Sequence, residues 1–447
     1  MCSIVIVILL YKIKKFLLQI LKIKEDNYMD KNKTDLIEIY PLTVTQKTML
    51  MKCLLHSDSR LYVEQFMFRL KYDIPVSRII KIWERIQERH KMMGAVIKWK
   101  GLKQPLLILG TKKARITKYN LDGIAEEEKN NYIKITADKN WKEKVDIQNN
   151  SFEISIFHQN EKDIIMILDF HHIIFDGWSI SIILNEFINY LNTKNSNQNK
   201  VPLYKNYMSY YLKSLATNQI ESFWKSYIKE KTAEKSLCTG NQLQENDIEY
   251  KNYYIPEDII KKLKTFSAEN DFTFASIIYY LWFLALSKLS NEETITFGIT
   301  VSGRNIDVAG IENMTGMMIN TLPINLSTSL ISSNPKELIR KIMEEVILLN
   351  QHIFAFDSFR QNTHINLNNY LQTVVTVQSY PNNNNFYSEN SFVKLIYKKY
   401  QNPSPLSLGI SMYDNTCYFD FSYDSRIYSK ETVDEIYKNM LTNIEKL

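Results

Sequence analysis

The sequence predicts a mixed α/β protein that folds as a pair of lobes with a cleft between them. Its 447 residues are too many for one ordinary hydrophobic core, so two domains of roughly 200 residues each are expected. Segments with the periodicity of strands and of helices follow one another in both halves, which is typical of sheets covered by helices. A polar stretch at residues 231–247 interrupts this pattern and is the candidate boundary.

The chain is expected to divide into an N-terminal extension of residues 1–35, a first lobe of residues 36–240 and a second lobe of residues 241–447. The extension starts with a short apolar run followed by lysines. It lacks the charge order and cleavage site of a signal peptide, and the run is too short to span a bilayer. A mis-called start, with Met29 as the alternative first residue, is therefore favoured over a basic amphipathic helix on a membrane surface.

Composition argues against several classes of function. Hydrophobic residues make up 45% of the chain and charged residues 23%, which is an ordinary globular balance. The net charge is +6 and no dense Lys/Arg block occurs, so neither nucleic acid nor a membrane is the expected partner. The four cysteines form no CxxC pair, which supports neither a metal site nor a disulfide framework. Idle thiols in a reducing cytoplasm are expected instead.

Hydrophobic periodicity assigns the elements of the first lobe. Pro41 precedes a helix that Thr43 or Thr45 could cap. The apolar segments at 152–157 and 163–170 are expected to pair as a hairpin. The other elements expected in this lobe are strands at 61–70, 95–99 and 105–109 and helices at 76–90, 123–139 and 205–230.

The pattern starts again after the boundary, so the second lobe is also expected to mix helices and strands. Its expected strands are 249–255, 295–301, 317–326, 371–379, 392–399, 405–412 and 417–423, and its expected helices are 256–269, 273–289, 334–352 and 430–446.

The most informative stretch is HHIIFDGWS at residues 171–179. An apolar run that is typical of a buried strand precedes it, and an amphipathic helical segment follows it. Such a strand delivers ionisable groups to a turn, where a neutral imidazole is a good general base near neutral pH. Adjacent strand residues point to opposite faces, so only one of His171 and His172 can face a cleft. The other is expected to be buried and hydrogen-bonded; two ordinary core histidines are the alternative.

The residues that follow the histidines are expected to support the turn. Asp176 could fix the loop through a buried ion pair, for which Arg304 is the candidate. Gly177 permits a close backbone approach, and its amide could face a developing oxyanion at the start of the next helix. Ser179 lacks the frame of a nucleophile elbow and is expected to cap that helix. No Walker loop or dinucleotide-binding fingerprint is present.

HHIIFDG resembles the HHxxxDG signature of nonribosomal peptide synthetase condensation domains, which belong to the chloramphenicol-acetyltransferase-like acyltransferases. Companion blocks of that family occur in order, and the resemblance covers residues 36–447. The blocks are YPLTVTQKTML at 40–50, ERHKMMGAV at 88–96, YKNYMSYY at 204–211, VSGRN at 301–305, TGMMINTLPI at 315–324, QHIFAFDSF at 351–359 and FSYDSRIYSKETV at 421–433.

The resemblance implies two acetyltransferase-like lobes in a V-shaped pseudodimer, with an active-site tunnel between them. Phosphopantetheine arms of donor and acceptor carrier proteins would enter this tunnel from opposite ends, and no cofactor would be bound permanently. His172 would be the catalytic residue. The residues implied to support it are His171, Asp176, Gly177 and Arg304, and those implied to line the tunnel are Trp178, Ser179 and Asn320.

The implied reaction is amide formation between a carrier-bound acyl or peptidyl thioester and the amine of a carrier-bound aminoacyl thioester. Heterocyclisation domains replace the histidines with aspartates, and epimerisation domains read DGxSWR, so condensation is favoured. The form HHIIFDGWS leans towards an acceptor that follows an L-configured donor. The expected partners are donor and acceptor carriers and other synthetase modules. The chain is expected to be a free-standing gene product.

Three positions depart from the family blocks. Gly94 stands where the RHExLR block has its second arginine, Lys91 stands where that block has its acid, and Ala355 stands where the HQDxPFE block has its proline. The departures at Gly94 and Ala355 keep open the alternative of a catalytically idle scaffold that only docks carriers. A second alternative is transfer of the acyl group to a free amine or alcohol.

Overall fold

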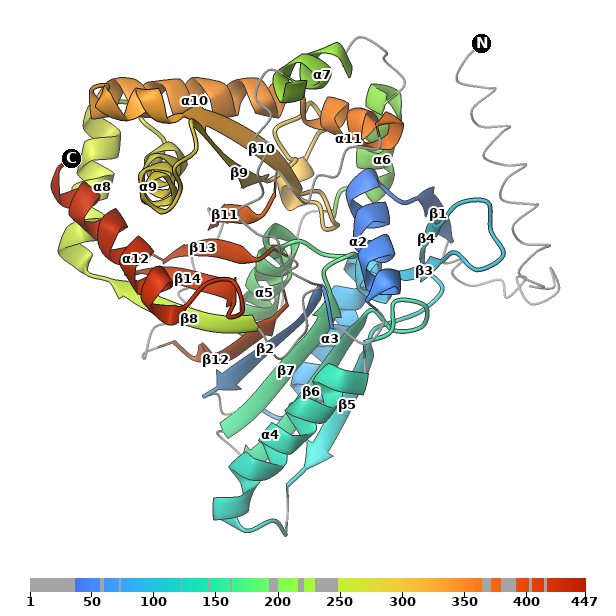
Figure 1. The fold of residues 1–447 in the computed structure, drawn as a ribbon. Helices are drawn as coiled ribbons and strands as arrows, with labels where there is room; N and C mark the ends of the chain where they lie inside the picture. The colour runs from blue at the N-terminus through green and yellow to red at the C-terminus, as the bar shows by residue number, and fades with distance from the viewer. Residues whose placement is uncertain are drawn as a thin grey trace.

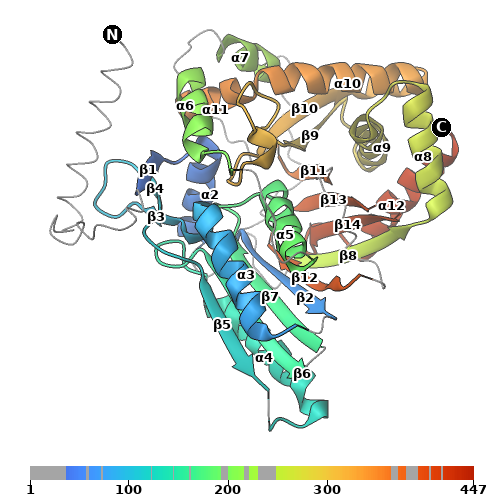
Figure 2. The ribbon, with the colours of Figure 1, turned by 180° about the vertical axis from the view of Figure 1, so that it is seen from behind.

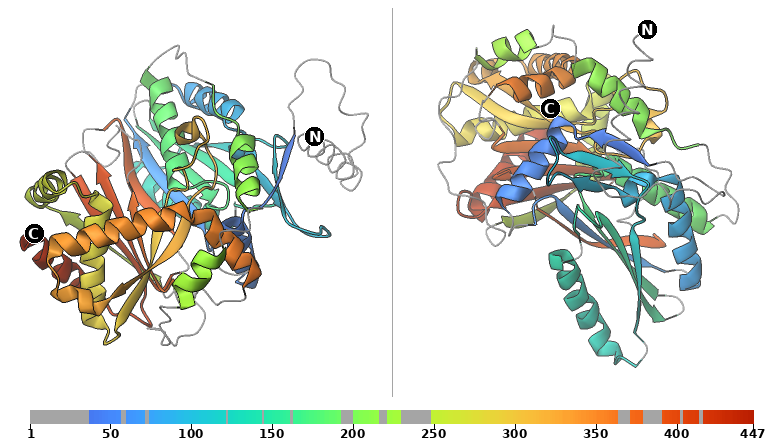
Figure 3. Two further views of the ribbon diagram at one scale, coloured as in Figure 1. Left: turned by 90° about the horizontal axis from the view of Figure 1, so that it is seen from above. Right: turned by 90° about the vertical axis from the view of Figure 1, so that its right-hand side faces the viewer.

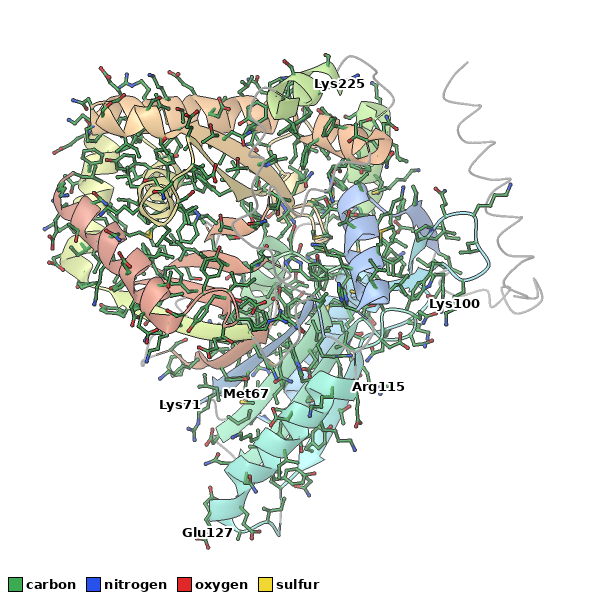
Figure 4. All side chains as sticks on the ribbon, viewed as in Figure 1. Met67, Lys71, Lys100, Arg115, Glu127 and Lys225 are labelled. Atoms are coloured by element: carbon green, nitrogen blue, oxygen red, sulfur yellow. The ribbon has the colours of Figure 1, made fainter. Side chains whose placement is uncertain are left out.

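A computed structural model describes residues 37–56, 60–71, 74–121, 123–143, 145–160, 163–192, 200–215, 221–229, 248–363, 371–378, 391–401, 404–413 and 416–447. The extension of residues 1–35, Met29 and the expected boundary at 231–247 lie outside these residues. The described residues form two large sheets, each with its own set of helices (Figure 1). Side chains fill the space between the helices and the sheets (Figure 4).

The first sheet has five strands in the order β12-β2-β7-β6-β5. The expected hairpin is confirmed, because β6 and β7 are antiparallel with Phe152 opposite Phe170. Helix α4 covers one face of this sheet, and α3 and α5 cover the other (Figures 1 and 2). The bounds are β2 Val63–Leu70, β5 Arg115–Asn120, β6 Phe152–Asn160, β7 Asp163–His171, β12 Val393–Tyr400, α3 Val76–Arg89, α4 Glu126–Glu143 and α5 Gly177–Asn192.

Strand β12 shows that the division into sequence halves is not followed strictly. The strand expected at 392–399 exists, but it pairs antiparallel with β2 of the first sheet and not with the sheet of the second half. Without this pairing, β2 would be an exposed edge with unsatisfied backbone groups. Lys398 of β12 lies over the ring of Phe66 of β2, 5.6 Å from its centroid, which adds a side-chain contact to the pairing.

The second sheet has six strands in the order β10-β9-β11-β13-β14-β8. Helix α9 is apolar on nearly all sides, and it packs between α10 and α12 against β9 and β11 (Figures 1 and 3). The bounds are β8 Ile248–Ile255, β9 Thr294–Val301, β10 Asn320–Ser327, β11 Thr373–Gln378, β13 Leu406–Tyr413, β14 Thr416–Asp424, α8 Glu257–Glu269, α9 Phe274–Leu289, α10 Pro335–Gln351 and α12 Lys430–Glu445.

The remaining elements lie around the junction of the two halves. Thr43, one of the two expected caps, begins α2 in a reciprocal capping box with Gln46. The helical stretch expected at 205–230 is divided into α6 and α7, and α11 was not expected. The bounds are β1 Glu38–Pro41, β3 Val96–Lys98, β4 Leu106–Leu109, α2 Val44–Leu55, α6 Tyr204–Leu215, α7 Glu221–Lys229, α11 Ile353–Asn362 and the short 3-10 helices Lys91–Gly94, Ile311–Asn313 and Thr328–Ser332.

Within the described ranges, no single helix has the length and hydrophobicity to cross a membrane. Helices α8 and α9 meet these criteria only when they are taken together, and they are bent by 113° at the break between them.

Candidate active site

The HHIIFDG segment forms the turn between a buried strand and a helix, as the sequence predicts. Strand β7 ends at His171, and α5 begins at Gly177. The three residues between His172 and Asp176 are completely buried, so the core holds the turn from below. The turn therefore presents its polar residues from a rigid base.

His171 is the buried histidine of the pair. Its Nδ1 accepts a hydrogen bond from the backbone N–H of Ile173 at 3.0 Å, so the neutral ring carries its proton on Nε2. That nitrogen lies 3.5 Å from the sulfur of Cys53. Burial lowers the pKa of His171 to about 3, and the neighbouring charges of His172 and Arg60 act in the same direction. His171 is therefore neutral near pH 7.

His172 is the histidine with an accessible ring. Its backbone N–H donates to the carbonyl of Tyr62 at 2.7 Å, and its side chain is 21% exposed. Within the described part of the chain, its Nδ1 is buried and has no hydrogen-bond partner. Its Nε2 lies 3.6 Å from Oε1 of Glu64, a residue of β2. Of the two histidines, His172 is thus the one whose ring could meet a reactant.

Tyr62, which holds the backbone of His172, has an unusual conformation. Its φ of 64° lies in the left-handed region, which costs a bulky residue about 1–3 kcal/mol. The backbone of Gln401, just after β12, accepts a hydrogen bond from Tyr62 N–H at 3.1 Å. The crossing of β12 into the first sheet therefore helps to fix the residue that positions His172.

The predicted ion pair between Asp176 and Arg304 is confirmed. Arg304 Nη1 lies 2.7 Å from Asp176 Oδ2, and Nη2 lies 3.0 Å from Oδ1. Both side chains are buried. Burial alone would raise the pKa of Asp176, but the Arg304 charge and the hydrogen bonds from Arg304 and Ser179 outweigh it and lower this pKa. The ionised pair joins the turn to the VSGRN segment of the second half.

The helix cap predicted at Ser179 is wrong, and Asp176 has that role. The Asp176 carboxylate precedes α5 and accepts the backbone N–H of Ser179 at 2.9 Å. A negatively charged cap also complements the helix dipole, which a hydroxyl cannot do. The Ser179 hydroxyl instead accepts the N–H of Gly316 at 3.0 Å, a contact with the second half.

Of the three residues implied to line a tunnel, only Trp178 is partly exposed, and its Nε1 donates to the carbonyl of Glu312 at 2.8 Å. Ser179 and Asn320 are buried. The Asn320 amide donates to Asp357 at 3.0 Å. Because Ser179 and Asn320 are buried, neither side chain is expected to line an open tunnel.

Asn320 belongs to a buried network that joins the halves beside the turn. Its Oδ1 lies 3.3 Å from the hydroxyl of Thr45, in the first turn of α2. Asp357 of α11 accepts a hydrogen bond from Tyr211 at 3.0 Å, and the Tyr211 oxygen accepts the backbone N–H of Val44 at 2.9 Å. The start of α2 is therefore tied to α6, α11 and β10.

Gly94 and Ala355, two of the three departures from the family blocks, lie in packed positions. A Cβ atom at Gly94 would lie 1.8 Å from the carbonyl oxygen of Lys112, so a side chain does not fit there. Ala355 is buried in α11. The preceding His90 remains in place and contacts Glu186 at 2.8 Å and Thr315 at 3.2 Å. The RHExLR-like segment thus keeps its contact between the halves despite the missing arginine.

The sequence reasoning missed Glu64. Glu64 shares one face of β2 with Phe66, Phe68 and Leu70, so it interrupts an apolar face. That interruption of the apolar face was the sequence signal from which Glu64 could have been found.

The described residues do not form a metal site. Within the described ranges, no three His, Cys, Asp or Glu residues converge in a way that could hold a metal ion.

A sequence model named "Condensation domain" matches residues 37–447. The chain belongs to the condensation domain family. Curated relatives of this condensation domain include bacitracin synthase 3 of Bacillus licheniformis, which is 24% identical over 323 residues, or 70% of this chain and 5% of that protein. Tyrocidine synthase 3 of Brevibacillus parabrevis is 21% identical over 429 residues, or 93% of this chain and 7% of that protein. The condensation domain therefore spans only a small part of these relatives.

Solved structures share the fold of the condensation domain at low sequence identity. The cyclization-docking bidomain from Sorangium cellulosum has a TM-score of 0.76 at 14% identity, with 91% of this chain and 83% of that chain covered. The epimerization domain of tyrocidine synthetase B has a TM-score of 0.74 at 13% identity, with 93% and 98% covered. The first condensation domain of the calcium-dependent antibiotic synthetase has a TM-score of 0.72 at 12% identity, with 91% and 95% covered. The predicted acetyltransferase-like fold is confirmed, but likeness of fold does not separate these reactions.

Proposed function

We propose that this condensation domain forms an amide bond between a carrier-bound acyl or peptidyl thioester and the amine of a carrier-bound aminoacyl thioester. The observation that carries the proposal is the difference between the two histidines: His171 is buried and neutral, whereas His172 has an accessible ring on a fixed turn. The curated relatives are named as synthases of bacitracin and tyrocidine, which supports peptide assembly as the context.

In the proposed reaction, the amine nitrogen attacks the thioester carbonyl, a C–N bond forms, and the C–S bond breaks. The nitrogen loses one proton and the departing thiolate gains one. A neutral His172 imidazole would accept the first proton and return a proton to sulfur, a role that typically accelerates reactions by about 10²–10⁴-fold. The Asp176–Arg304 pair would support the turn without taking part in proton transfer.

The proposed substrates arrive on phosphopantetheine arms, so a donor carrier and an acceptor carrier are the proposed partners. The Gly177 amide, at the start of α5, is proposed to face the oxyanion of the tetrahedral intermediate. The cap formed by Asp176 places a negative charge at the same helix end, which would weaken this support. The proton transfer at His172 is therefore the larger proposed contribution.

The retained histidine pair supports condensation over cyclization, although a cyclization domain shares the fold. Neither Gly94 nor Ala355 lies on the HHIIFDG turn, and both are tightly packed. The replacement of the family's arginine and proline at these two positions therefore gives no support to an inactive domain.

The proposal is tested by incubating the wild-type chain with a panel of acyl-loaded donor carriers and aminoacyl-loaded acceptor carriers. Intact-protein mass spectrometry should detect the amide on the acceptor carrier. A parallel reaction replaces the acceptor carrier with free amines and alcohols. Product only in that parallel reaction would favour transfer to a free acceptor, and carrier binding without any product would favour the idle scaffold.

A further inference from the structure

Strand β2 carries a carboxylate on the face of the first sheet that belongs to the active site. Glu64, Phe66, Phe68 and Leu70 alternate onto this face, and Gln65 on the opposite face donates to the carbonyl of Ala137 in α4. An acid contributes nothing to an apolar packing face and loses hydration there. Its presence therefore needs another explanation.

The backbone brings Glu64 within reach of His172. The hydrogen bond from His172 N–H to Tyr62 O sets these two residues opposite each other, and Glu64 is two residues further along the same face. Diagonal neighbours at this spacing meet when their side chains are long. The 3.6 Å between Glu64 Oε1 and His172 Nε2 agrees with that expectation.

The Glu64 carboxylate is enclosed but poorly paired. Its side chain is 16% exposed. Across the described residues, it accepts no side-chain hydrogen bond, and His172 is the only basic side chain with a nitrogen within 4.0 Å of its oxygens. Tyr400 of β12 lies opposite Glu64, and the Lys398 ammonium lies 4.9 Å from the centre of the Tyr400 ring. A largely buried carboxylate without a strong donor favours the arrival of a cation.

We propose that Glu64 binds the protonated amine of the acceptor beside His172 and so selects acceptors that carry an amine. This inference rests on the proposed amide-forming function and assigns its acceptor subsite. Free α-amines have an ordinary pKa of about 8, so most acceptor molecules arrive as ammonium ions near pH 7. A carboxylate at the reactive histidine would hold that ion next to the base that must activate it.

The proton balance of the step is complete. The bound ammonium first releases one proton to solvent, which leaves a neutral amine. This amine attacks the thioester carbon, and its second proton passes to His172 Nε2 and then to the departing thiolate. One thioester and one ammonium ion therefore give one amide, one thiol and one released proton, with no oxidant or reductant.

The test measures binding and does not require turnover. Three probes are amides of aminopantetheine that carry an alanyl, a lactyl or a propionyl group, and they differ only in an amine, a hydroxyl or a hydrogen. Calorimetry should show that the wild-type chain binds the alanyl probe about tenfold or more tightly than the propionyl probe, as a charge-assisted hydrogen bond predicts. Glu64→Gln should reduce this ratio to near one without changing the affinity for the propionyl probe.

Two variants control this measurement. Glu88→Gln removes a carboxylate of α3 that is 65% exposed, and it should keep the wild-type preference. Glu64→Asp keeps the charge and should keep part of the preference. A wild-type chain without preference, or a Glu64→Gln variant that retains it, would overturn the assignment. An intact alanyl preference in a chain that joins no pair of loaded carriers would instead count against the proposed function.

Discussion

At the residue scale, the surroundings of each histidine divide their roles. His171 is held by Ile173 and Cys53, whereas His172 is partly exposed next to Glu64. The alternation of strand residues predicted that only one histidine could face a cleft, but it could not choose between them. The choice depends on the strand pairing of β2, which a local pattern does not contain.

The buried His171 predicts a dependence of stability on pH. Its pKa is about 3 in the folded chain and about 6.5 when unfolded, so the unfolded state binds more protons between these values. The stabilisation is complete above about pH 6.5 and is lost on acidification, by up to about 1.4 kcal/mol per pH unit. Urea unfolding of the wild type and of His171→Asn, whose amide oxygen can replace Nδ1, measures this contribution. If the unfolding free energy depended on pH with the same slope in both chains, the assignment of a buried, neutral His171 would be contradicted.

The Asp176–Arg304 pair predicts a large loss of stability when one partner loses its charge. Asp176→Asn leaves the Arg304 guanidinium buried without a counter-charge, which costs about 3–5 kcal/mol. Equilibrium denaturation measures this cost. The exposed carboxylate of Glu88 offers a control, because Glu88→Gln should change stability by no more than about 0.5 kcal/mol. If Asp176→Asn lost no more stability than Glu88→Gln, the Asp176–Arg304 pair would not hold the turn.

At the element scale, long periodic segments were predictable and unusual pairings were not. The β6–β7 hairpin and helix α3 have strong periodicity, α9 is a long and almost wholly apolar segment, and all three were expected. Strand β5 was missed because none of the side chains of RITKYN is fully buried, so the segment lacks an apolar face. The sheet to which β12 belongs could not be predicted, since the pairing partner of an edge strand is set by the tertiary structure.

The 3-10 helix at Lys91–Gly94 predicts which glycine substitution is harmful. Gly94→Ala would place its Cβ against the carbonyl of Lys112 and should destabilise the chain by about 1–3 kcal/mol. Gly409→Ala is the matched control, because its Cβ would lie 3.7 Å from the nearest atom, an ordinary contact. Thermal unfolding compares the two variants. If both substitutions lowered the unfolding temperature equally, the packing around Gly94 would leave room for a side chain at the position of the family's arginine.

At the scale of the whole molecule, the two halves share one core and several buried polar contacts. A single cluster of buried hydrophobic residues includes residues of both halves. The Asp176–Arg304 pair, the His90–Thr315 contact and the Asn320–Thr45 contact join the halves around the HHIIFDG turn. The ordered sequence blocks predicted this family and fold. They did not predict that Ser179 and Asn320 would be buried between the halves.

The most direct test of the account is the single-turnover rate of amide formation by His172→Ala between a loaded donor carrier and a loaded acceptor carrier. The control is His158→Ala, because His158 lies at the opposite end of the β6–β7 hairpin from the turn. We expect the His172→Ala rate to fall by about 10²–10⁴-fold while the unfolding midpoint stays near that of the wild type. The His158→Ala rate should stay close to wild type. An undiminished rate in His172→Ala would contradict the proposed proton transfer at His172.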